Sequence, residues 1–245
     1  MEYKATEKGF NLCCNGVNFE FSETKKFAKN GIFYETSVLG NAPVPKIQKG
    51  DRILLPMGEG IAVTSGVFSN CEKEMADEIF KVKMDNDSIG GIIQTAICNL
   101  PVGLGEPWFD SFEGIISNAL FSIGGIKGVE FGAGFGFADL TGSNANDAFT
   151  YKMGKVVTKT NNSGGINGGI TNGMPVIFNA AVKPTPSISK PQETIDFING
   201  TNTSLEIVGR HDPAIIRRIC IVVTSLIAVV VCDVLSQTYG KDYLQ

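Results

Sequence analysis

The spacing of apolar residues predicts alternating helices and strands in the middle of the chain. Residues 72–83 and 109–122 carry apolar side chains at the intervals of an amphipathic helix. Residues 89–98 instead alternate small and branched side chains, which is typical of a strand. The inward-facing positions of the two helices would be Met75, Ile79 and Phe80 in the first and Phe112, Ile115, Ile116 and Leu120 in the second.

The beginning of the chain has a different pattern. Short alternating stretches at residues 18–21, 31–34 and 52–55 are separated by Gly, Asn and Pro, as in strands joined by turns. We therefore expect a small β-rich head at residues 1–68, followed by a second unit at residues 69–245. No catalytic constellation is visible in the head, so its function stays unassigned.

A nearly continuous apolar run covers residues 219–232 and is interrupted only by Thr224 and Ser225. A membrane-spanning helix needs about 20 apolar residues, and Asp233 closes this run earlier. The run therefore predicts a buried helix or strand, and no membrane partner is expected.

Composition narrows the classes of function. A formal net charge of -4 argues against a nucleic-acid partner, although a local group of Lys and Arg could still hold a phosphate. The chain has six cysteines in no CxxC pair and one histidine, so no metal site is expected. Scattered cysteines and a polar N-terminus without a signal-peptide pattern indicate a cytoplasmic protein.

Glycine is concentrated at a few places. The chain has 29 glycines, and they gather at residues 124–125, 132–136 and 163–169. Such clusters have two interpretations. They form flexible turns, or they let several backbone N–H groups approach one ligand closely.

A series of short blocks continues from residue 87 to residue 213. In order, they are DSIGG at 87–91, NLPVGLGEPWFD at 99–110, SIGGIKGVEFG at 122–132, GS at 142–143, SGGINGGI at 163–170, KPTPSI at 183–188 and GRHDP at 209–213. Together they resemble the C-terminal part of chorismate synthases, and the resemblance covers residues 69–245. A series in family order is more specific than any single block.

The resemblance implies an α+β fold, as part of the family's β-α-β sandwich in which helices lie between antiparallel sheets. It implies a lyase of the shikimate pathway that converts 5-enolpyruvylshikimate 3-phosphate to chorismate and phosphate, for aromatic amino acid biosynthesis. The family uses reduced FMN without net redox change, in an anti 1,4-elimination that flavin assists with electron density. A homo-oligomer is also implied, since the family forms tetramers.

The resemblance further implies a set of cofactor-binding residues. The family's flavin contacts fall on Gly124, Gly125, Gly168, Lys183, Pro184, Thr185, Pro186, Ser187 and Arg210. These residue types suit the role, because glycine N–H groups approach a ligand closely, basic side chains neutralise anions and hydroxyls donate hydrogen bonds. Without the resemblance, residues 183–185 would be interpreted as a solvated turn.

Asp212 is the candidate catalytic residue, because it matches the family's acidic residue thought to act on the N5 proton of the flavin. A carboxylate near flavin can work as a base once its pKa is tuned. Its position before Pro213 is equally that of a cap that accepts N–H groups at the start of a helix. Both roles are compatible.

Other family features have no counterpart. The family's protonating histidines lie in its N-terminal half, whereas His211 is the single histidine of this chain and matches a position beside the acid. The family's Arg-Ser-Ser block and its N-terminal arginines are missing too. Losing contacts to the transition state costs orders of magnitude in rate, so we expect a truncated, impaired enzyme. The alternative is a catalytically silent FMN- or phosphate-binding remnant or fusion protein.

Overall fold

The computed structural model describes most of the chain. It gives the backbone of residues 2–6, 9–14, 17–22, 34–38, 52–54, 62–67, 72–152 and 154–240. Side chains are described at Val63 and Ser65 and over residues 75–152 and 154–240. Helices mix with antiparallel sheets throughout these residues, which confirms the predicted α+β class.

A five-stranded antiparallel sheet forms the centre of the molecule, with the strand order β4-β6-β7-β13-β8. The strands are β4 (Tyr34–Val38), β6 (Ala62–Val67), β7 (Gly91–Cys98), β13 (Val176–Val182) and β8 (Ile126–Phe131). In β7, residues 93–98 are all buried, so both faces of this strand are covered. The predicted strand at 89–98 is confirmed and begins two residues later than expected.

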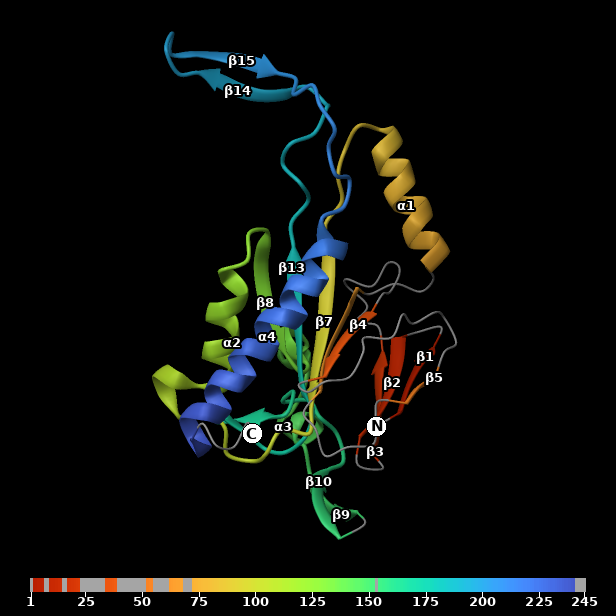
Figure 1. Cartoon of the computed structure of the whole chain (residues 1–245), viewed down its shortest axis with the longest axis vertical. Helices are drawn as coiled ribbons and strands as arrows, with labels where there is room; N and C mark the ends of the chain where they lie inside the picture. Colours follow the sequence, from red (N-terminus) through yellow and green to blue (C-terminus); the bar gives the residue numbers. More distant parts are fainter. Residues whose placement is uncertain are drawn as a thin grey trace.

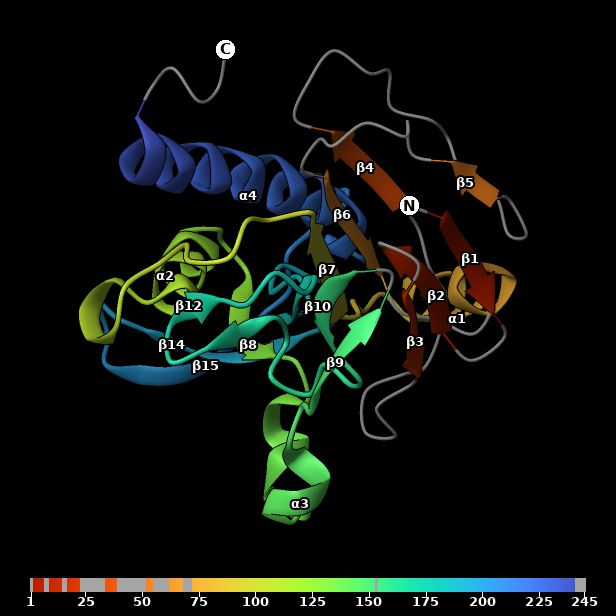
Figure 2. The ribbon, with the colours of Figure 1, turned by 90° about the horizontal axis from the view of Figure 1, so that it is seen from below.

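Two helices lie across one face of this sheet, α2 (Phe112–Phe121) and α4 (Ile216–Tyr239), as Figures 1 and 2 show. On that face Ile93 lies opposite Ala180, and Ile97 lies opposite Val176. These residues belong to one hydrophobic cluster with the inner sides of both helices. The largest fully buried side chains are Phe112, Phe178, Ile93, Ile97, Leu104, Ile116, Leu120, Ile227 and Leu235.

The apolar run near the C-terminus forms α4, so the expected buried element is a helix. The expectation that the run is too short for a membrane is wrong, because α4 has 24 residues and a mean hydropathy of 2.6 in its most apolar window. By length and composition it could cross a bilayer. Its inner side packs on the sheet at helical spacing, as in the core helix of a folded domain. The buried positions are Ile216, Ile219, Cys220, Val223, Thr224, Ile227, Val231, Val234 and Leu235.

The first predicted helix is confirmed as α1 (Glu72–Met84), which lies at the edge of the molecule (Figure 1). Met75 is buried and Ile79 packs against the core, as expected. The inward placement of Phe80 is wrong, because its side chain is 62% exposed. At an edge position only a narrow stripe of the helix meets the core, so the neighbouring apolar position stays outside.

The second predicted helix begins three residues later than expected. Residues Trp108–Asp110 form a short 3₁₀ turn, η1, and α2 follows from Phe112. Ser111 separates them because its hydroxyl accepts a hydrogen bond from the Gly114 N–H, which caps the helix. Ile116 and Leu120 are buried, and Ile115 packs against the core, as the spacing predicts.

The predicted head contributes strands to two sheets. A four-stranded sheet of order β3-β2-β1-β5 contains β1 (Glu2–Thr6), β2 (Gly9–Cys14), β3 (Val17–Ser22) and β5 (Arg52–Leu54). By contrast, β4 and β6 pair into the central sheet, which therefore crosses the predicted boundary at residue 68. The two-unit division stays a prediction. Parts of the predicted stretches and of the junction lie outside the described residues, namely residues 31–33, 55 and 68–71.

Smaller elements extend from the two ends of the sheet (Figure 1). The hairpin of β14 (Gln192–Asp196) and β15 (Thr201–Leu205) projects beyond the end of β13, while β9 (Phe149–Lys152) and β10 (Lys155–Thr158) project at the opposite end. The remaining elements are η2 (Gly134–Asp139), α3 (Gly142–Ala145), β11 (Ile166–Asn167) and β12 (Ile170–Thr171).

Candidate functional site

The segment before β7 contacts both the predicted cofactor-binding stretch and the residue after Asp212. The Ser88 hydroxyl donates a hydrogen bond to the Thr185 carbonyl over 2.6 Å, and the Ile89 N–H donates to the Pro213 carbonyl over 2.8 Å. Gly90 allows this approach, because a Cβ there would lie 2.4 Å from the Val182 carbonyl oxygen. The stretch after β13 and the segment before α4 therefore meet at one end of the sheet.

Gly125 brings the turn between α2 and β8 to the same end. Its carbonyl accepts a hydrogen bond from the Lys183 N–H over 2.8 Å, and its φ of +103° suits glycine. A Cβ at Gly125 would lie 3.2 Å from the Ile219 side chain of α4. Gly124 beside it is exposed, and a Cβ there would meet no atom within 4 Å. Open space of this kind leaves room for a ligand against the backbone.

The stretch at residues 183–187 combines exposed and buried groups. Lys183, Pro184 and Pro186 are exposed, whereas Thr185 and Ser187 are half-buried. The Thr185 hydroxyl oxygen is itself buried, and it has no hydrogen-bond partner among the described residues. A buried hydroxyl without a partner is costly, so this oxygen fits a ligand that would hydrogen-bond to it.

Residues 210–212 lie just before α4. Arg210 is exposed, and the His211 Nε2 lies 2.9 Å from the Ile207 carbonyl. Asp212 accepts a hydrogen bond from the Ala214 N–H over 3.2 Å and lies 3.4 Å from the Nε of Arg218. The capping interpretation of Asp212 is wrong, because the N-cap of α4 is Ile215 and has no side-chain hydrogen bond, whereas Ala214 precedes the helix. The Asp212 side chain is 29% exposed, so an oxygen remains accessible for chemistry.

Gly168 does not join this group. It lies in the turn between β11 and β12, and the neighbouring Gly169 carbonyl accepts a hydrogen bond from the Phe112 N–H at the start of α2. The loop carrying it precedes β13, while Lys183 follows β13. The seven residues of that strand span roughly 20 Å. Gly168 therefore sits near the opposite end of the sheet from the other predicted contacts, and its cofactor role stays a prediction.

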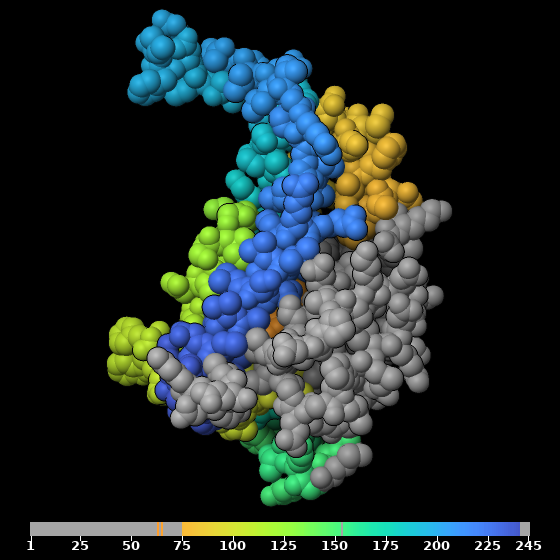
Figure 3. All heavy atoms as spheres, viewed as in Figure 1, coloured from red at the N-terminus to blue at the C-terminus, as the bar shows by residue number. Residues whose placement is uncertain are grey.

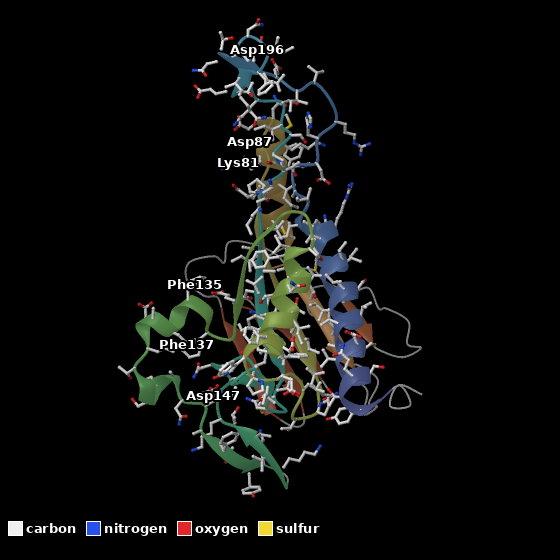
Figure 4. All side chains as sticks on the ribbon, turned by 90° about the vertical axis from the view of Figure 1, so that its left-hand side faces the viewer. Lys81, Asp87, Phe135, Phe137, Asp147 and Asp196 are labelled. Atoms are coloured by element: carbon white, nitrogen blue, oxygen red, sulfur yellow. The ribbon has the colours of Figure 1, made fainter. Side chains whose placement is uncertain are left out.

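The glycine-rich loop at residues 160–165 is held by a carboxylate that the sequence did not single out. Asp147 accepts hydrogen bonds from the Asn162 and Ser163 N–H groups over 2.7 and 2.8 Å, and from the Thr160 hydroxyl over 2.6 Å. Figure 4 shows Asp147 at the end of the molecule away from Asp87. No spacing rule points to Asp147, because its partners are brought to it by the fold.

A second group that sequence reasoning missed is an ion cluster at the end of the sheet where residues 183–187 lie. Lys190 donates to Asp87 over 2.9 Å and also to Asp85. The hydrogen bond from Lys190 holds the pKa of the Asp87 carboxyl below its usual range. The hydrogen bonds to Asp85 and Asp87 raise the pKa of the Lys190 ammonium. Among the described side chains, no group of three or more His, Cys, Asp or Glu could hold a metal ion.

Fold and site together define a class: an α+β protein whose antiparallel sheet ends in a glycine-rich turn bonded to a Lys-Pro-Thr stretch. The chorismate synthase family profile matches residues 59–236. The chain therefore belongs to the chorismate synthase family, as its blocks predicted.

Individual relatives agree with this assignment. The chain is 48% identical over 159 residues to the chorismate synthase of Thermococcus kodakarensis, covering 65% of this chain and 45% of that protein. It is 49% identical over 161 residues to the chorismate synthase of Dehalococcoides mccartyi strain BAV1, covering 66% and 44%. The chain thus spans less than half the length of these relatives.

A solved structure supports the predicted fold. A crystal structure of a chorismate synthase is similar with a TM-score of 0.57 at 29% identity, covering 72% of this chain and 49% of that one. The expectation of a partial fold of this family is therefore confirmed.

Proposed function

We propose that this chain carries the C-terminal part of a chorismate synthase site, which binds reduced FMN and 5-enolpyruvylshikimate 3-phosphate. The observation that supports the proposal is the convergence of Gly125, residues 183–185 and Pro213, the residue after Asp212, at one end of the sheet. The buried Thr185 hydroxyl without a partner among the described residues fits an oxygen-rich ligand there. The reaction would be loss of phosphate and of a ring hydrogen to give chorismate.

Each residue type has a chemical task. Lys183 and Arg210 are exposed cations that can neutralise phosphate or carboxylate groups, and Thr185 and Ser187 can donate hydrogen bonds to oxygens. Pro184 and Pro186 restrict the backbone that presents them. Gly124 offers an open surface for close approach. Reduced flavin, when bound, would supply electron density as phosphate leaves.

Asp212 would act as the proton acceptor of the site. Its carboxylate is partly exposed, so it can accept a proton from a neighbouring group once a ligand excludes water. The bonds to Ala214 and Arg218 hold the carboxylate in place at the start of α4. The same contacts that fix the side chain leave it partly exposed for proton transfer.

Turnover by this chain alone would be slow. The sole histidine of the sequence, His211, lies beside Asp212 with its Nε2 2.9 Å from the Ile207 carbonyl, and it does not match the protonating histidines of the family. Losing one group that acts in the transition state costs about 100- to 10,000-fold in rate. The family's cytoplasmic location and tetrameric assembly are proposed for this chain as well.

An anaerobic assay tests the activity. The purified chain is mixed with reduced FMN and 5-enolpyruvylshikimate 3-phosphate, and chorismate is followed by its absorbance against a full-length chorismate synthase. We expect little or no product. Chorismate formation at a rate near that of the full-length enzyme would contradict the need for further histidines.

A second candidate function is ligand binding without turnover. It is favoured by the same basic and hydroxyl groups, which are present while the family's protonating histidines have no counterpart. Quenching of flavin fluorescence would detect binding, and a Lys183→Ala, Arg210→Ala double variant should abolish it. Quenching that persists in this double variant would exclude the proposed site.

A further inference from the structure

The cofactor-binding stretch at residues 183–187 continues into a lysine with two carboxylate partners. Lys190 contacts Asp87 at 2.9 Å and Asp85, which lie 103 and 105 positions earlier in the chain. Both carboxylates belong to the turn between α1 and β7. This ion cluster therefore ties the connection between β13 and β14 to a distant segment.

The neighbours of Asp87 contact the same stretch directly. The Ser88 hydroxyl binds the Thr185 carbonyl, and a Cβ at Gly90 would lie 3.0 Å from the Pro184 ring. Asp87 also accepts a hydrogen bond from the Ser88 N–H over 2.8 Å, which fixes its own side chain. The segment at residues 85–90 thus holds the stretch at two places, at residues 184–185 and at Lys190.

The connection between β13 and β14 needs side-chain contacts because its backbone makes few hydrogen bonds. Residues 183–191 lie outside helices and strands, and Pro184 and Pro186 have no N–H to donate. The two contacts therefore add to the few hydrogen bonds that order this connection, such as that from the Lys183 N–H to the Gly125 carbonyl. Ordering the connection before a ligand binds reduces the entropy lost on binding.

We infer that Lys190, anchored by Asp85 and Asp87, is a positioning residue that fixes residues 183–187 in the shape that binds an anionic flavin. This inference rests on the proposed function. Two of the three N–H donors of the Lys190 ammonium are directed at the carboxylates, so the task we assign to it is holding the stretch rather than contacting the ligand. It acts through the placement of Lys183 and Thr185.

The test uses matched lysine substitutions in the full chain. Lys190→Met removes the contact, and Lys81→Met removes the same charge from an exposed lysine of α1 whose partner is Glu78 at 3.8 Å. Flavin affinity is measured by quenching of FMN fluorescence, and ordering of the stretch by hydrogen exchange of the Lys183 N–H group, which donates to the Gly125 carbonyl. Lys190→Met should weaken FMN binding about three- to fivefold, the range of a good surface ion pair.

A conservative variant separates positioning from general damage. Lys190→Arg keeps a cation that can reach both carboxylates, and it should restore FMN affinity and slow exchange at the Lys183 N–H. Lys81→Met should leave both measurements unchanged. If the wild-type chain binds FMN and Lys190→Met binds it with the same affinity, this inference is overturned while the proposed function stands. A wild-type chain that leaves flavin fluorescence unquenched contradicts the proposed function itself.

Discussion

Two adjacent glycines at the candidate site have different structural requirements. Gly125 adopts a positive φ and packs against α4, while its carbonyl binds the Lys183 N–H. Gly124 has open space where a Cβ would point. The sequence places them in one Gly-Gly pair, so only the structure shows that Gly125 serves folding and Gly124 leaves a surface free.

Substitution of these glycines should affect stability unequally. Gly125→Ala forces a Cβ into left-handed backbone and toward Ile219, so we expect a loss of about 1–3 kcal/mol in the free energy of unfolding. Gly124→Ala is the matched control and should change it by less than about 0.5 kcal/mol. Urea unfolding of the two variants measures both values. Equal losses would show that Gly125 has no special backbone role.

Asp147 marks the limit of sequence reasoning at this scale. Its three donors, from residues 160, 162 and 163, lie 13 to 16 positions away along the chain. A lone aspartate in a polar stretch gives no periodic signal, and its partners depend on how the loop folds back. The resemblance pointed to the glycines of that loop but not to the carboxylate that holds them.

At the scale of elements, the projecting hairpin depends on a carboxylate at its turn. Asp196 ends β14 and accepts hydrogen bonds from the Ile198 and Asn199 N–H groups over 2.9 and 3.1 Å, as well as from the Asn199 side chain over 2.6 Å. The hydrogen bond from the Asn199 side chain is the largest cause that holds the pKa of the Asp196 carboxyl below its usual range. All residues of β15 are exposed, so the hairpin has little burial to stabilise it and depends on the hydrogen bonds of its turn.

Acid should therefore loosen this hairpin. A carboxyl whose folded pKa is depressed stabilises the fold above its unfolded pKa, and the contribution is lost as pH falls through the folded value. Protection of the Ile198 and Asn199 N–H groups against hydrogen exchange should be constant above about pH 5 and decline below about pH 4. Asp196→Asn should remove this pH dependence, and a decline that persists in the variant would assign it to another group.

The sequence predicted the helices and strands better than it predicted which of them pair with one another. Apolar spacing located α1, β7 and α2 within three residues, because periodic burial is written into the order of side chains. It did not show that β6 pairs with β7 across the expected boundary, since pairing between strands depends on long-range packing. It also left α4 open between helix and strand, because a β-branched apolar run suits both when buried.

At the scale of the whole molecule, α4 has an inner side in the core and an outer side at the surface. Figure 3 shows part of this helix as a blue band along the visible face. Ile221, Val222 and Val229 are exposed on it, the last by 65%. Apolar side chains gathered on one helix face are typical of an interaction surface, which fits the proposed homo-oligomer.

A charge on this outer side should weaken self-association. Val229→Asp places a carboxylate where an apolar contact is expected, and we predict at least a tenfold or so weaker assembly by light scattering coupled to size exclusion. Asn146→Asp adds the same charge at an exposed loop position and should leave the mass unchanged. The helix should keep its fold in both variants, because neither position lies in the core cluster. A wild-type chain that elutes as a monomer, or a Val229→Asp variant with the wild-type mass, would show that this side of α4 does not join subunits.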